Sequence, residues 1–206
     1  MLISGGVFNG LNVNCGRNNQ FVLRDDILEA IDLRLRFMTE CHPFVLILRY
    51  DLRFPQHAQF QHYRHALQNF MNSFSVYLKR RNIHYHYVWV KEIESSVNPH
   101  YHCVFIISAG QYNSYFLTCE ARNTWSRICS ESSGYASDSL LHCCPRILRD
   151  GSLQWDVLIS RDDPNFEVEI RDIFYWLSYL AKINTKTLNP GRGNRWWGSS
   201  RCDMCG

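Results

Sequence analysis

The sequence predicts an α+β fold, with an antiparallel sheet and helices packed on it. Three observations carry this prediction. Segments with helix and strand patterning alternate along the chain, and their order leaves two pairs of consecutive strands. Turn residues join the strands of each pair, which predicts hairpins and therefore antiparallel pairing. With 206 residues, 46% of them hydrophobic, the chain is long enough for one sizeable core.

The composition favours a cytoplasmic protein without a membrane segment. Nine cysteines are scattered along the chain and lack the spacing of a disulfide framework. The start at residues 1–6 lacks the charged and long apolar regions of a signal peptide. No apolar stretch approaches the roughly 20 residues that span a bilayer. The net charge of +3 permits a nucleic-acid partner but does not argue for one.

In the first half of the chain, the residue pattern predicts a buried strand with one helix before it and one helix after it. A Gly- and Asn-rich stretch, residues 1–22, is typical of an arm or a loosely packed lead-in. Residues 24–39 carry apolar side chains at helical spacing. The apolar run over residues 44–53 predicts a buried strand that Pro55 ends, and residues 57–80 predict a long helix.

The second half predicts four strands and two helices. The turn string at residues 95–99 joins two apolar runs and predicts a hairpin, and a second turn string follows at residues 149–152. The expected elements are strands over residues 85–93, 100–108, 139–148 and 153–159, and helices over residues 112–129 and 165–182. The last 24 residues are Gly-rich, basic and aromatic.

Two histidines in the strand over residues 100–108 predict half of a metal site. His100 and His102 flank one residue, so their side chains project from the same face of a strand. Two imidazoles on a rigid backbone suit a divalent ion. The alternative is that both are ordinary half-exposed strand residues. The same tripeptide recurs at residues 84–86, so the pattern alone is not specific.

A carboxylate on the neighbouring strand completes the expected site. Residues opposite each other in a hairpin face the same way, so a pairing of Glu92 with His100 or His102 puts all three side chains on one face. Glu94 has the same parity, and Asp51 could serve instead if the first strand lies beside the histidines. Two imidazoles and one carboxylate leave open positions for water and phosphate oxygens and tolerate Mg²⁺ or Mn²⁺.

The helix expected over residues 165–182 carries the candidate nucleophile. Tyr175, Tyr179, Lys182 and Lys186 follow one another at i, i+4, i+7 and i+11 and so form one stripe. A tyrosine hydroxyl is a poor nucleophile at neutral pH, and a nearby cation favours its anionic form. Lys182 suits that role. The alternative is that both tyrosines pack at the rim of the core.

Five strings, in this order, resemble a known superfamily. They are Leu48–Pro55, Trp89–Glu92, His100–His102, Ser178–Lys182 and Trp197–Arg201. Together they resemble the HUH endonucleases, named for the His-hydrophobic-His motif, and among them the rolling-circle replication initiators. The resemblance is closest to the YagK/YfjJ group and the inovirus-type replication proteins. The one mild departure within these strings is the tryptophan at position 197, where the closer relatives tend to have phenylalanine.

The resemblance implies a ferredoxin-like (RRM-like) sheet of five antiparallel strands that holds the metal ligands, with the tyrosine helix beside them. It implies that His100, His102 and Glu92 hold Mg²⁺ or Mn²⁺ and that Tyr179 attacks a phosphodiester of single-stranded DNA. A 5′-phosphotyrosine link forms, and the released 3′-hydroxyl primes rolling-circle replication of a phage, plasmid or related element.

The same resemblance ranks the two tyrosines. Some relatives use two tyrosines four residues apart, each followed three residues later by lysine. Tyr179 has Lys182 at that position, whereas Tyr175 has Ser178. Tyr179 is therefore the expected nucleophile, and Tyr175 is a second nucleophile or a residue that stacks on DNA.

Cations and aromatic rings alternate near the C-terminal end of the chain. Arg192, Arg195, Trp197 and Arg201 stand among glycines, and Lys186 precedes them. Such a segment can neutralise phosphates and stack on unpaired bases, so these residues are candidates for DNA binding. The alternative is a tail whose tryptophans anchor it to the domain.

Two other functions stay open at this point. One is a DNA-binding regulator that uses the same sheet without cleavage. The other is a zinc-binding interaction module, in which Cys202 and Cys205 need two more ligands, such as those offered by His142, Cys143 and Cys144.

The expected organisation is one catalytic domain over residues 41–201. An N-terminal arm and helix over residues 1–40 precede it, and a short tail over residues 202–206 follows it. Single-stranded or origin DNA is the expected partner. The chain has no G-x-x-x-x-G-K-[ST] phosphate loop, so the replication helicase and the polymerase are expected to come from the host.

Overall fold

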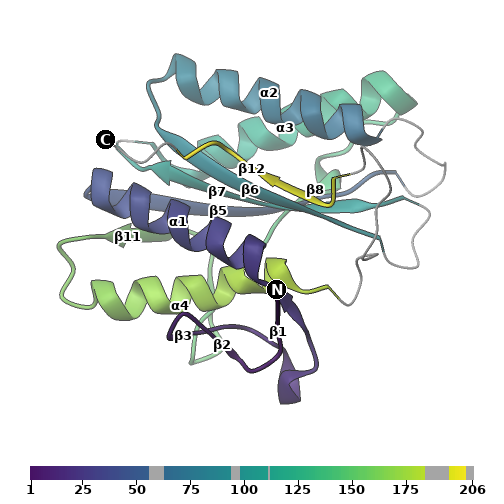
Figure 1. Cartoon of the computed structure of the whole chain (residues 1–206). Coiled ribbons are helices and arrows are strands. Elements are labelled where there is room, and N and C mark those ends of the chain that lie inside the picture. Colours follow the sequence, from purple (N-terminus) through teal and green to yellow (C-terminus); the bar gives the residue numbers. More distant parts are fainter. Residues whose placement is uncertain (56–62, 94–97, 111, 184–194, 203–206) are drawn as a thin grey trace.

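A computed structural model describes most of the chain. The described residues are 1–55, 63–93, 98–110, 112–183 and 195–202. They form three layers, in which one sheet lies between two pairs of helices (Figure 1). The α+β prediction is therefore confirmed.

Two helices cover each face of the sheet. Helices α2 (Tyr63–Arg80) and α3 (Ser114–Ser133) lie on one face. Helices α1 (Asp25–Cys41) and α4 (Phe166–Ser178) lie on the other face. All four were expected from helical periodicity. Residues 57–62 of the second expected helix lie outside the described residues.

The main sheet has six strands and is antiparallel throughout. Its order is β11–β5–β7–β6–β12, and β8 also pairs with β5. The succession β5, α2, β6, β7, α3, β11 is the ferredoxin-like order of elements. The bounds of the six strands are Phe44–Leu52 (β5), Tyr85–Glu92 (β6), His100–Ser108 (β7), Leu141–Cys143 (β8), Val157–Ser160 (β11) and Trp197–Ser199 (β12).

The sixth strand and two interruptions were not predicted. Strand β12 comes from the basic C-terminal segment and pairs with the outer edge of β6, whose backbone groups would otherwise lack partners. The expected strands over residues 139–148 and 153–159 are each broken. Their inner ends, β9 (Arg146–Ile147) and β10 (Leu153–Gln154), form a separate hairpin. Its turn places Gly151 at a φ of +83°, which glycine adopts without strain.

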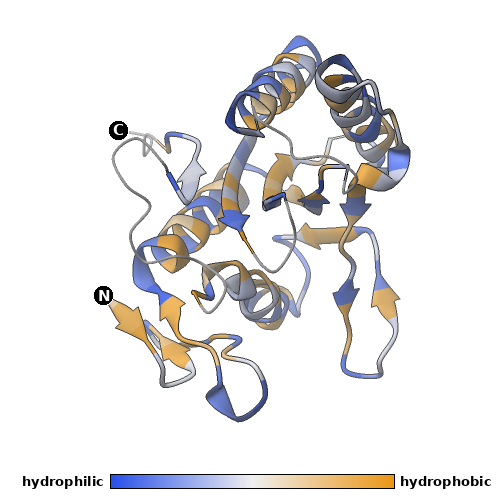
Figure 2. Ribbon diagram, turned by 90° about the vertical axis from the view of Figure 1, so that its right-hand side faces the viewer, coloured by the Kyte–Doolittle hydropathy of each residue, from blue (hydrophilic) through white to orange (hydrophobic). Residues whose placement is uncertain are grey.

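Alternation along the strands divides the buried side chains into two cores. On β5, Leu46, Leu48 and Tyr50 face α2 and α3, whereas Val45 and Ile47 face α1 and α4. Both faces are covered, so β5 and β7 are buried almost from end to end. Figure 2 shows the apolar strands between helices whose ribbons carry both polar and apolar residues.

The N-terminal lead-in is more closely packed than expected. Phe8, Val13 and Cys15 are buried in the core beneath α4, and the ring of Phe8 stacks on that of Phe174 at 6.4 Å between centroids. The prediction of a loose arm is therefore wrong for these three residues. The short elements of this region are β1 (Leu2–Ile3), β2 (Val7–Phe8), β3 (Leu11–Asn12), the 3-10 turn η1 (Arg17–Asn19) and β4 (Leu23–Arg24).

Helix α4 ends earlier than its pattern predicts. It stops at Ser178 and continues as the 3-10 turn η3 (Tyr179–Ala181), and Lys182 then forms an antiparallel bridge with Leu23. Another 3-10 turn, η2 (Asp138–Leu140), precedes β8. Among the described helices, none is both long and apolar enough to cross a bilayer.

Candidate metal centre and tyrosine

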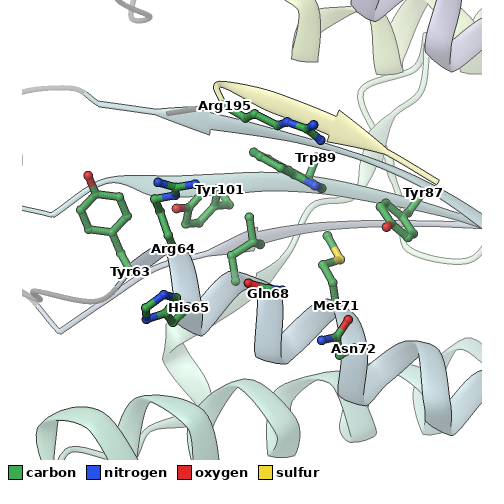
Figure 3. A pocket seen from close by; sticks show the side chains of 11 residues that line it. Tyr63, Arg64, His65, Gln68, Met71, Asn72, Tyr87, Trp89, Tyr101 and Arg195 are labelled. Atoms are coloured by element: carbon green, nitrogen blue, oxygen red, sulfur yellow. The ribbon is translucent and has the colours of Figure 1, made fainter. Parts of the chain in front are cut away.

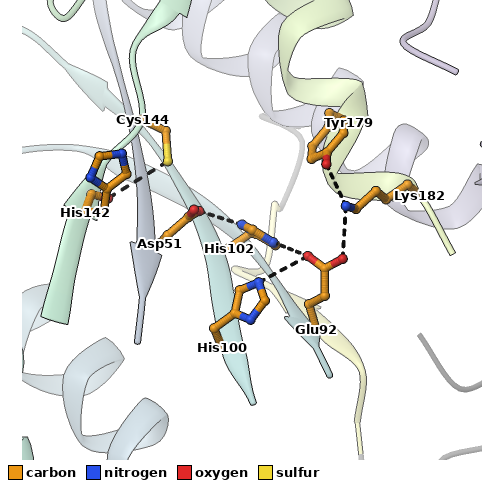
Figure 4. A network of polar contacts seen from close by, with 8 residues as sticks. All are labelled: Asp51, Glu92, His100, His102, His142, Cys144, Tyr179 and Lys182. Carbon is orange, nitrogen blue, oxygen red and sulfur yellow. Dashed lines mark hydrogen bonds and ion pairs between the residues drawn. The ribbon is translucent and has the colours of Figure 1, made fainter. Parts of the chain in front are cut away.

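Two neighbouring strands bring the three candidate metal ligands to one point. In the β6–β7 pair, Glu92 lies opposite His100, and His102 lies two residues further along β7 on the same face. One donor atom from each of Glu92, His100 and His102 lies within 4.8 Å of the other two (Figure 4). The face they share is the one covered by α1 and α4, because Tyr101 between the two histidines belongs to the opposite core.

His102 is held between two carboxylates. Its Nδ1 lies 2.5 Å from Oδ1 of Asp51, and its Nε2 contacts Oε2 of Glu92. Nε2 of His100 lies 3.3 Å from the same Glu92 oxygen. Burial alone lowers the pKa of His102, but the hydrogen bonds with Asp51 and Glu92 outweigh it and raise the pKa. Without a metal, the carboxylates therefore favour the imidazolium form.

The register of the sheet also explains the place of Asp51. Asp51 on β5 lies directly opposite His102 on β7, which brings its carboxylate to the outer ring nitrogen. Burial raises the pKa of Asp51, but the hydrogen bond with His102 and the nearby cations dominate and lower it to about 2. Asp51 thus lies behind His102 and orients its ring, whereas Glu92 lies on the side of both histidines. The other alternative, Glu94, lies outside the described residues.

The turn after α4 brings Tyr179 and Lys182 to this cluster. Nζ of Lys182 donates to the Tyr179 hydroxyl at 2.6 Å and lies 3.0 Å from Oε1 of Glu92 (Figure 4). In a 3-10 turn, side chains three residues apart lie above each other, so the early end of α4 favours this contact. The ammonium therefore bridges the phenol and the carboxylate.

The electrostatics of Lys182 and Glu92 agree with that bridge. Burial lowers the pKa of Lys182, but the contacts with Tyr179 and Glu92 outweigh it and raise the pKa. For Glu92, burial raises the pKa, and hydrogen bonds with the two histidines together with the Lys182 charge lower it well below its usual range. Both groups are therefore charged at neutral pH, although each is buried.

The donor set fits a divalent metal ion. Two imidazole nitrogens and one carboxylate oxygen form a mixed set of borderline and hard ligands that leaves coordination positions open. The carboxylate of Asp51 behind His102 is the usual outer partner of a metal-binding histidine, which fixes the ring and its tautomer. Glu92, His100 and His102 could therefore hold such an ion.

One residue near the tyrosine was missed by the sequence analysis. Arg49 on β5 is 9% exposed, and its Cζ lies 5.5 Å from the ring centroid of Tyr179 and 5.7 Å from that of Trp176. Its buried Nε has no hydrogen-bond partner among the described residues. Its position two residues before Asp51 could have placed it on the face of the metal ligands.

Arg49 lies in a groove of about 1070 Å³ that reaches the nucleophile candidate. Tyr175, Trp176 and Tyr179 contribute to its wall. Tyr175 is 44% exposed, and no contact between Tyr175 and the metal ligands is found within the described segments. Helical spacing predicted that Tyr175 and Tyr179 lie on one stripe. The two side chains instead diverge, because α4 changes to a 3-10 turn at Tyr179.

The expected DNA-binding residues lie in several places. Arg195 and Arg201 are exposed, and Trp197 lies in β12 opposite Val90 of β6. Lys186 and Arg192 lie outside the described residues, and so does Cys205. Among the described residues, the cysteines take part in no group of three metal-binding side chains, and His142 and Cys143 point to opposite sides of β8.

A family model for the YagK/YfjJ C-terminal domain matches residues 6–200 of the chain. No curated protein matches the sequence. Among solved structures, the N-terminal nuclease domain of non-structural protein 1 of minute virus of mice is similar over 77% of this chain and 99% of that chain, with 8% identity and a TM-score of 0.38. That domain coordinates Zn²⁺ in its active-site pocket. A likeness this low carries no argument about the activity of the present chain.

Proposed function

The chain belongs to the YagK/YfjJ C-terminal domain family, and we propose that it is a metal-dependent endonuclease of the HUH type. It nicks and rejoins single-stranded DNA at a specific site through a 5′-phosphotyrosine intermediate. The observation that carries the proposal is the bridge from Tyr179 through Lys182 to Glu92 beside two histidines. A phenol, a cation and a metal-binding set thereby surround one space.

In the proposed reaction, Tyr179 is the nucleophile. Its oxygen forms a bond to a phosphorus of the DNA backbone as the bond from that phosphorus to the 3′-oxygen breaks. The proton of the phenol passes to water, and the leaving 3′-oxygen takes a proton from water. The products are a 5′-phosphotyrosine and a free 3′-hydroxyl, and reversal of the step rejoins the strand.

The neighbouring residues each have a task in this reaction. Lys182 orients the Tyr179 hydroxyl for attack, because its ammonium already donates to that oxygen. Glu92, His100 and His102 hold the divalent ion, for which Mg²⁺ and Mn²⁺ are the candidates. When bound, that ion supplies Lewis-acid polarisation of the scissile phosphate. Asp51 keeps the Nε2 atom of His102 directed at the site.

Arg49 extends the proposed site toward the DNA backbone. The buried Nε of Arg49 has lost its hydration without gaining an acceptor among the described residues, so a phosphate oxygen in the groove beside Tyr179 would satisfy it. The released 3′-hydroxyl would prime a host polymerase, and a host helicase would separate the strands. This sequence of events would initiate rolling-circle replication of a phage, plasmid or related element in the cytoplasm.

The covalent link is the property to test. The protein is incubated with Mn²⁺ and a pool of random single-stranded oligonucleotides labelled at the 3′ end, and the products are separated on a denaturing gel. We expect a labelled protein band, because the tyrosine retains the 3′ fragment. The same pool labelled at the 5′ end should give no labelled protein, and EDTA should abolish the band.

Two matched tyrosine variants decide the nucleophile. Tyr179→Phe should abolish the labelled band, whereas Tyr175→Phe, one helical turn earlier and exposed, should retain it. A band that survives Tyr179→Phe would overturn the assignment.

The same assay separates the two rival functions. Oligonucleotide binding without any covalent band would indicate a DNA-binding regulator. Zinc released by substitution of Cys202 and Cys205, with neither DNA binding nor a band, would indicate a zinc-binding module.

A further inference from the structure

A second cavity lies on the opposite face of the sheet from the metal ligands. It has a volume of about 830 Å³ and opens between α2 and strands β6 and β7 (Figure 3). Side chains of β6 alternate between the faces, so Trp89 points into this cavity while Val90 points into the core under α1. The whole sheet therefore separates this cavity from the proposed reaction.

Aromatic rings form the sheet side of the cavity. Tyr87 and Trp89 come from β6 and Tyr101 from β7, and Tyr63 of α2 lies at one end (Figure 3). Trp89 and Tyr101 meet edge to face, with ring centroids 5.9 Å apart. Tyr87 and Trp89 are partly exposed, so their faces are accessible to a ligand.

A glycine allows the indole of Trp89 to lie where it does. Gly198 of β12 lies opposite Trp89 in the β6–β12 pair. A Cβ atom at position 198 would lie 2.8 Å from three atoms of the indole, which is closer than real Cβ contacts. The absence of a side chain at Gly198 therefore lets the indole pack directly on the backbone of β12, which fixes the orientation of the ring.

The charges around the cavity are all of one sign. Arg64 and Arg195 line it and are exposed, and no acidic residue is among the described residues that line it. Behind Tyr63 lies Lys91, which is only 2% exposed. Its Nζ is 4.2 Å from the ring centroid of Tyr63 and 5.3 Å from that of Trp196, and it has no hydrogen-bond partner among the described residues.

It is unusual for a buried ammonium to have only aromatic rings as partners among the described residues. Cation–π contacts offset part of its desolvation, but they do not neutralise the charge. Lys91 therefore adds to the positive potential of Arg64 and Arg195, and none of the described acidic residues forms an ion pair with these three. A ligand that carries both an aromatic ring and a negative charge would complement this cavity.

We propose that this cavity binds one unpaired nucleotide of the single-stranded DNA that flanks the reacting phosphate. This inference rests on the proposed function for its ligand class. The base stacks on Trp89, the amides of Gln68 and Asn72 face its edge, and the phosphate lies near Arg64 and Arg195. Bases of a duplex are already stacked on each other, so only an unpaired base can enter.

The size of the cavity agrees with this ligand. Pockets that enclose small molecules have volumes of about 300–1,000 Å³. The volume of this cavity therefore accommodates one nucleotide and excludes a DNA duplex. A free nucleotide has the same chemistry as a nucleotide within a strand, and the experiment must therefore include both.

The test measures DNA binding without cleavage. Tyr179→Phe protein in EDTA is titrated with a fluorescent oligo(dT), and anisotropy gives the dissociation constant. We expect Trp89→Leu and the double variant Arg64→Gln/Arg195→Gln each to weaken binding about tenfold. The matched controls are Trp155→Leu and Arg127→Gln, which change an exposed tryptophan and an exposed arginine away from the cavity and should leave affinity unchanged.

Two further titrations identify the ligand. An oligonucleotide with abasic sugars should lose its dependence on Trp89 and keep its dependence on the arginines. Free dTMP should compete only at concentrations far above those of the oligonucleotide, whereas equal competition would assign the cavity to a free nucleotide and overturn the proposal. Unchanged affinity of both cavity variants would overturn it as well.

Photocrosslinking tests the same contact without a substitution. Oligonucleotides that contain 5-iododeoxyuridine crosslink to adjacent aromatic rings on irradiation. We expect the crosslinked peptide to contain Tyr87 and Trp89, and a peptide from the metal face alone would contradict the proposal. This readout stays valid even if Trp89→Leu destabilises the fold.

The two proposals fail in different ways. A covalent band that forms normally in Trp89→Leu protein with unchanged DNA affinity would remove the cavity proposal and leave the endonuclease. Binding that depends on Trp89 without any covalent band would remove the endonuclease and leave the cavity.

Discussion

Two buried charges that are neighbours in the sequence have opposite surroundings. Glu92 faces α1 and α4 and is 1% exposed, and it contacts His100, His102 and Lys182. Lys91 faces α2 and is 2% exposed, and its Nζ lies near two aromatic rings but has no hydrogen-bond partner in the described part of the chain. One strand therefore carries a paired charge on one face and an unpaired charge on the other.

The difference indicates two kinds of site. On the face with the candidate metal ligands, each charge fixes its neighbour, so the side chains are positioned before any ligand arrives. On the face with the aromatic cavity, the positive charges have no acidic partner in the part of the chain that the structure describes, and they are available to an anion that enters. The first arrangement suits catalysis and the second suits binding.

Among the substitutions that test this comparison, Glu92→Gln is expected to have the largest effect on stability. The substitution leaves Lys182 and His102 buried without their shared carboxylate, which typically costs about 3 kcal/mol of unfolding free energy. It should also abolish binding of Mn²⁺, measured by calorimetry. The control is Glu167→Gln on α4, where an exposed ion pair of 3.9 Å contributes little. If the Glu92→Gln protein were as stable as the control, the carboxylate of Glu92 would not be the partner that stabilises buried Lys182 and His102.

The next largest effect on stability is expected for His86. This histidine is buried on the same face as Glu92, and one of its ring nitrogens lacks a partner among the described residues. Its Nδ1 bonds with the Ser200 hydroxyl, but Nε2 has no partner among the described residues. Burial, and then the charges of His84, which directly precedes β6, and of Arg34 of α1, lower its pKa to about 4.

The sign of the pH dependence follows from that shift. The unfolded chain binds the proton near pH 6.5 and the folded chain only near pH 4, so stability contributed by neutral His86 is complete above pH 6.5 and is lost as the pH falls. Between pH 6.5 and 5 the loss should reach at most about 2 kcal/mol. Urea unfolding at both pH values measures it. His86→Asn should lack this part of the pH dependence, and an equal slope in both proteins would contradict the prediction.

The smallest effect on stability is expected for Lys91→Met. The ammonium has no hydrogen-bonded partner among the described residues to leave behind, and methionine fills a similar volume beside the rings. The unfolding free energy should therefore change by less than about 1 kcal/mol. Affinity for oligo(dT) should fall severalfold, because the cavity loses positive potential. A loss of several kcal/mol in urea unfolding, similar to that of Glu92→Gln, would show that the two faces do not differ in this way.

Much of the fold could be predicted because strand and helix patterns are local. The strand over residues 100–108 has the predicted bounds, and the expected pairing of Glu92 with His100 is found in the register. The breaks within residues 139–159 could not be predicted in this way. Strands β8 and β11 both pair with β5, and this arrangement depends on the space that β5 leaves at its edge.

The sequence analysis missed features that depend on contacts between distant segments. Arg49 lies within the string Leu48–Pro55, but its place beside the candidate nucleophile becomes visible only because Trp176 and Tyr179 pack beside it. The segment that forms β12 was expected to bind DNA or, alternatively, to be a tail anchored by its tryptophans, since a basic, aromatic and Gly-rich segment has no strand pattern. Its pairing with β6 then puts Gly198 against Trp89 and gives the aromatic cavity its shape.

The sequence by itself determined which side chains share a face, because the two-residue period of a strand follows from backbone geometry. It placed His100 and His102 together and offered Glu92, Glu94 and Asp51 as partners. Only the tertiary structure placed Glu92 beside both histidines and Asp51 behind His102, by the register of three strands, and brought Lys182 within 3.0 Å of Glu92. That contact depends on how α4 packs on the sheet and where it ends, and both result from long-range burial that no local pattern encodes.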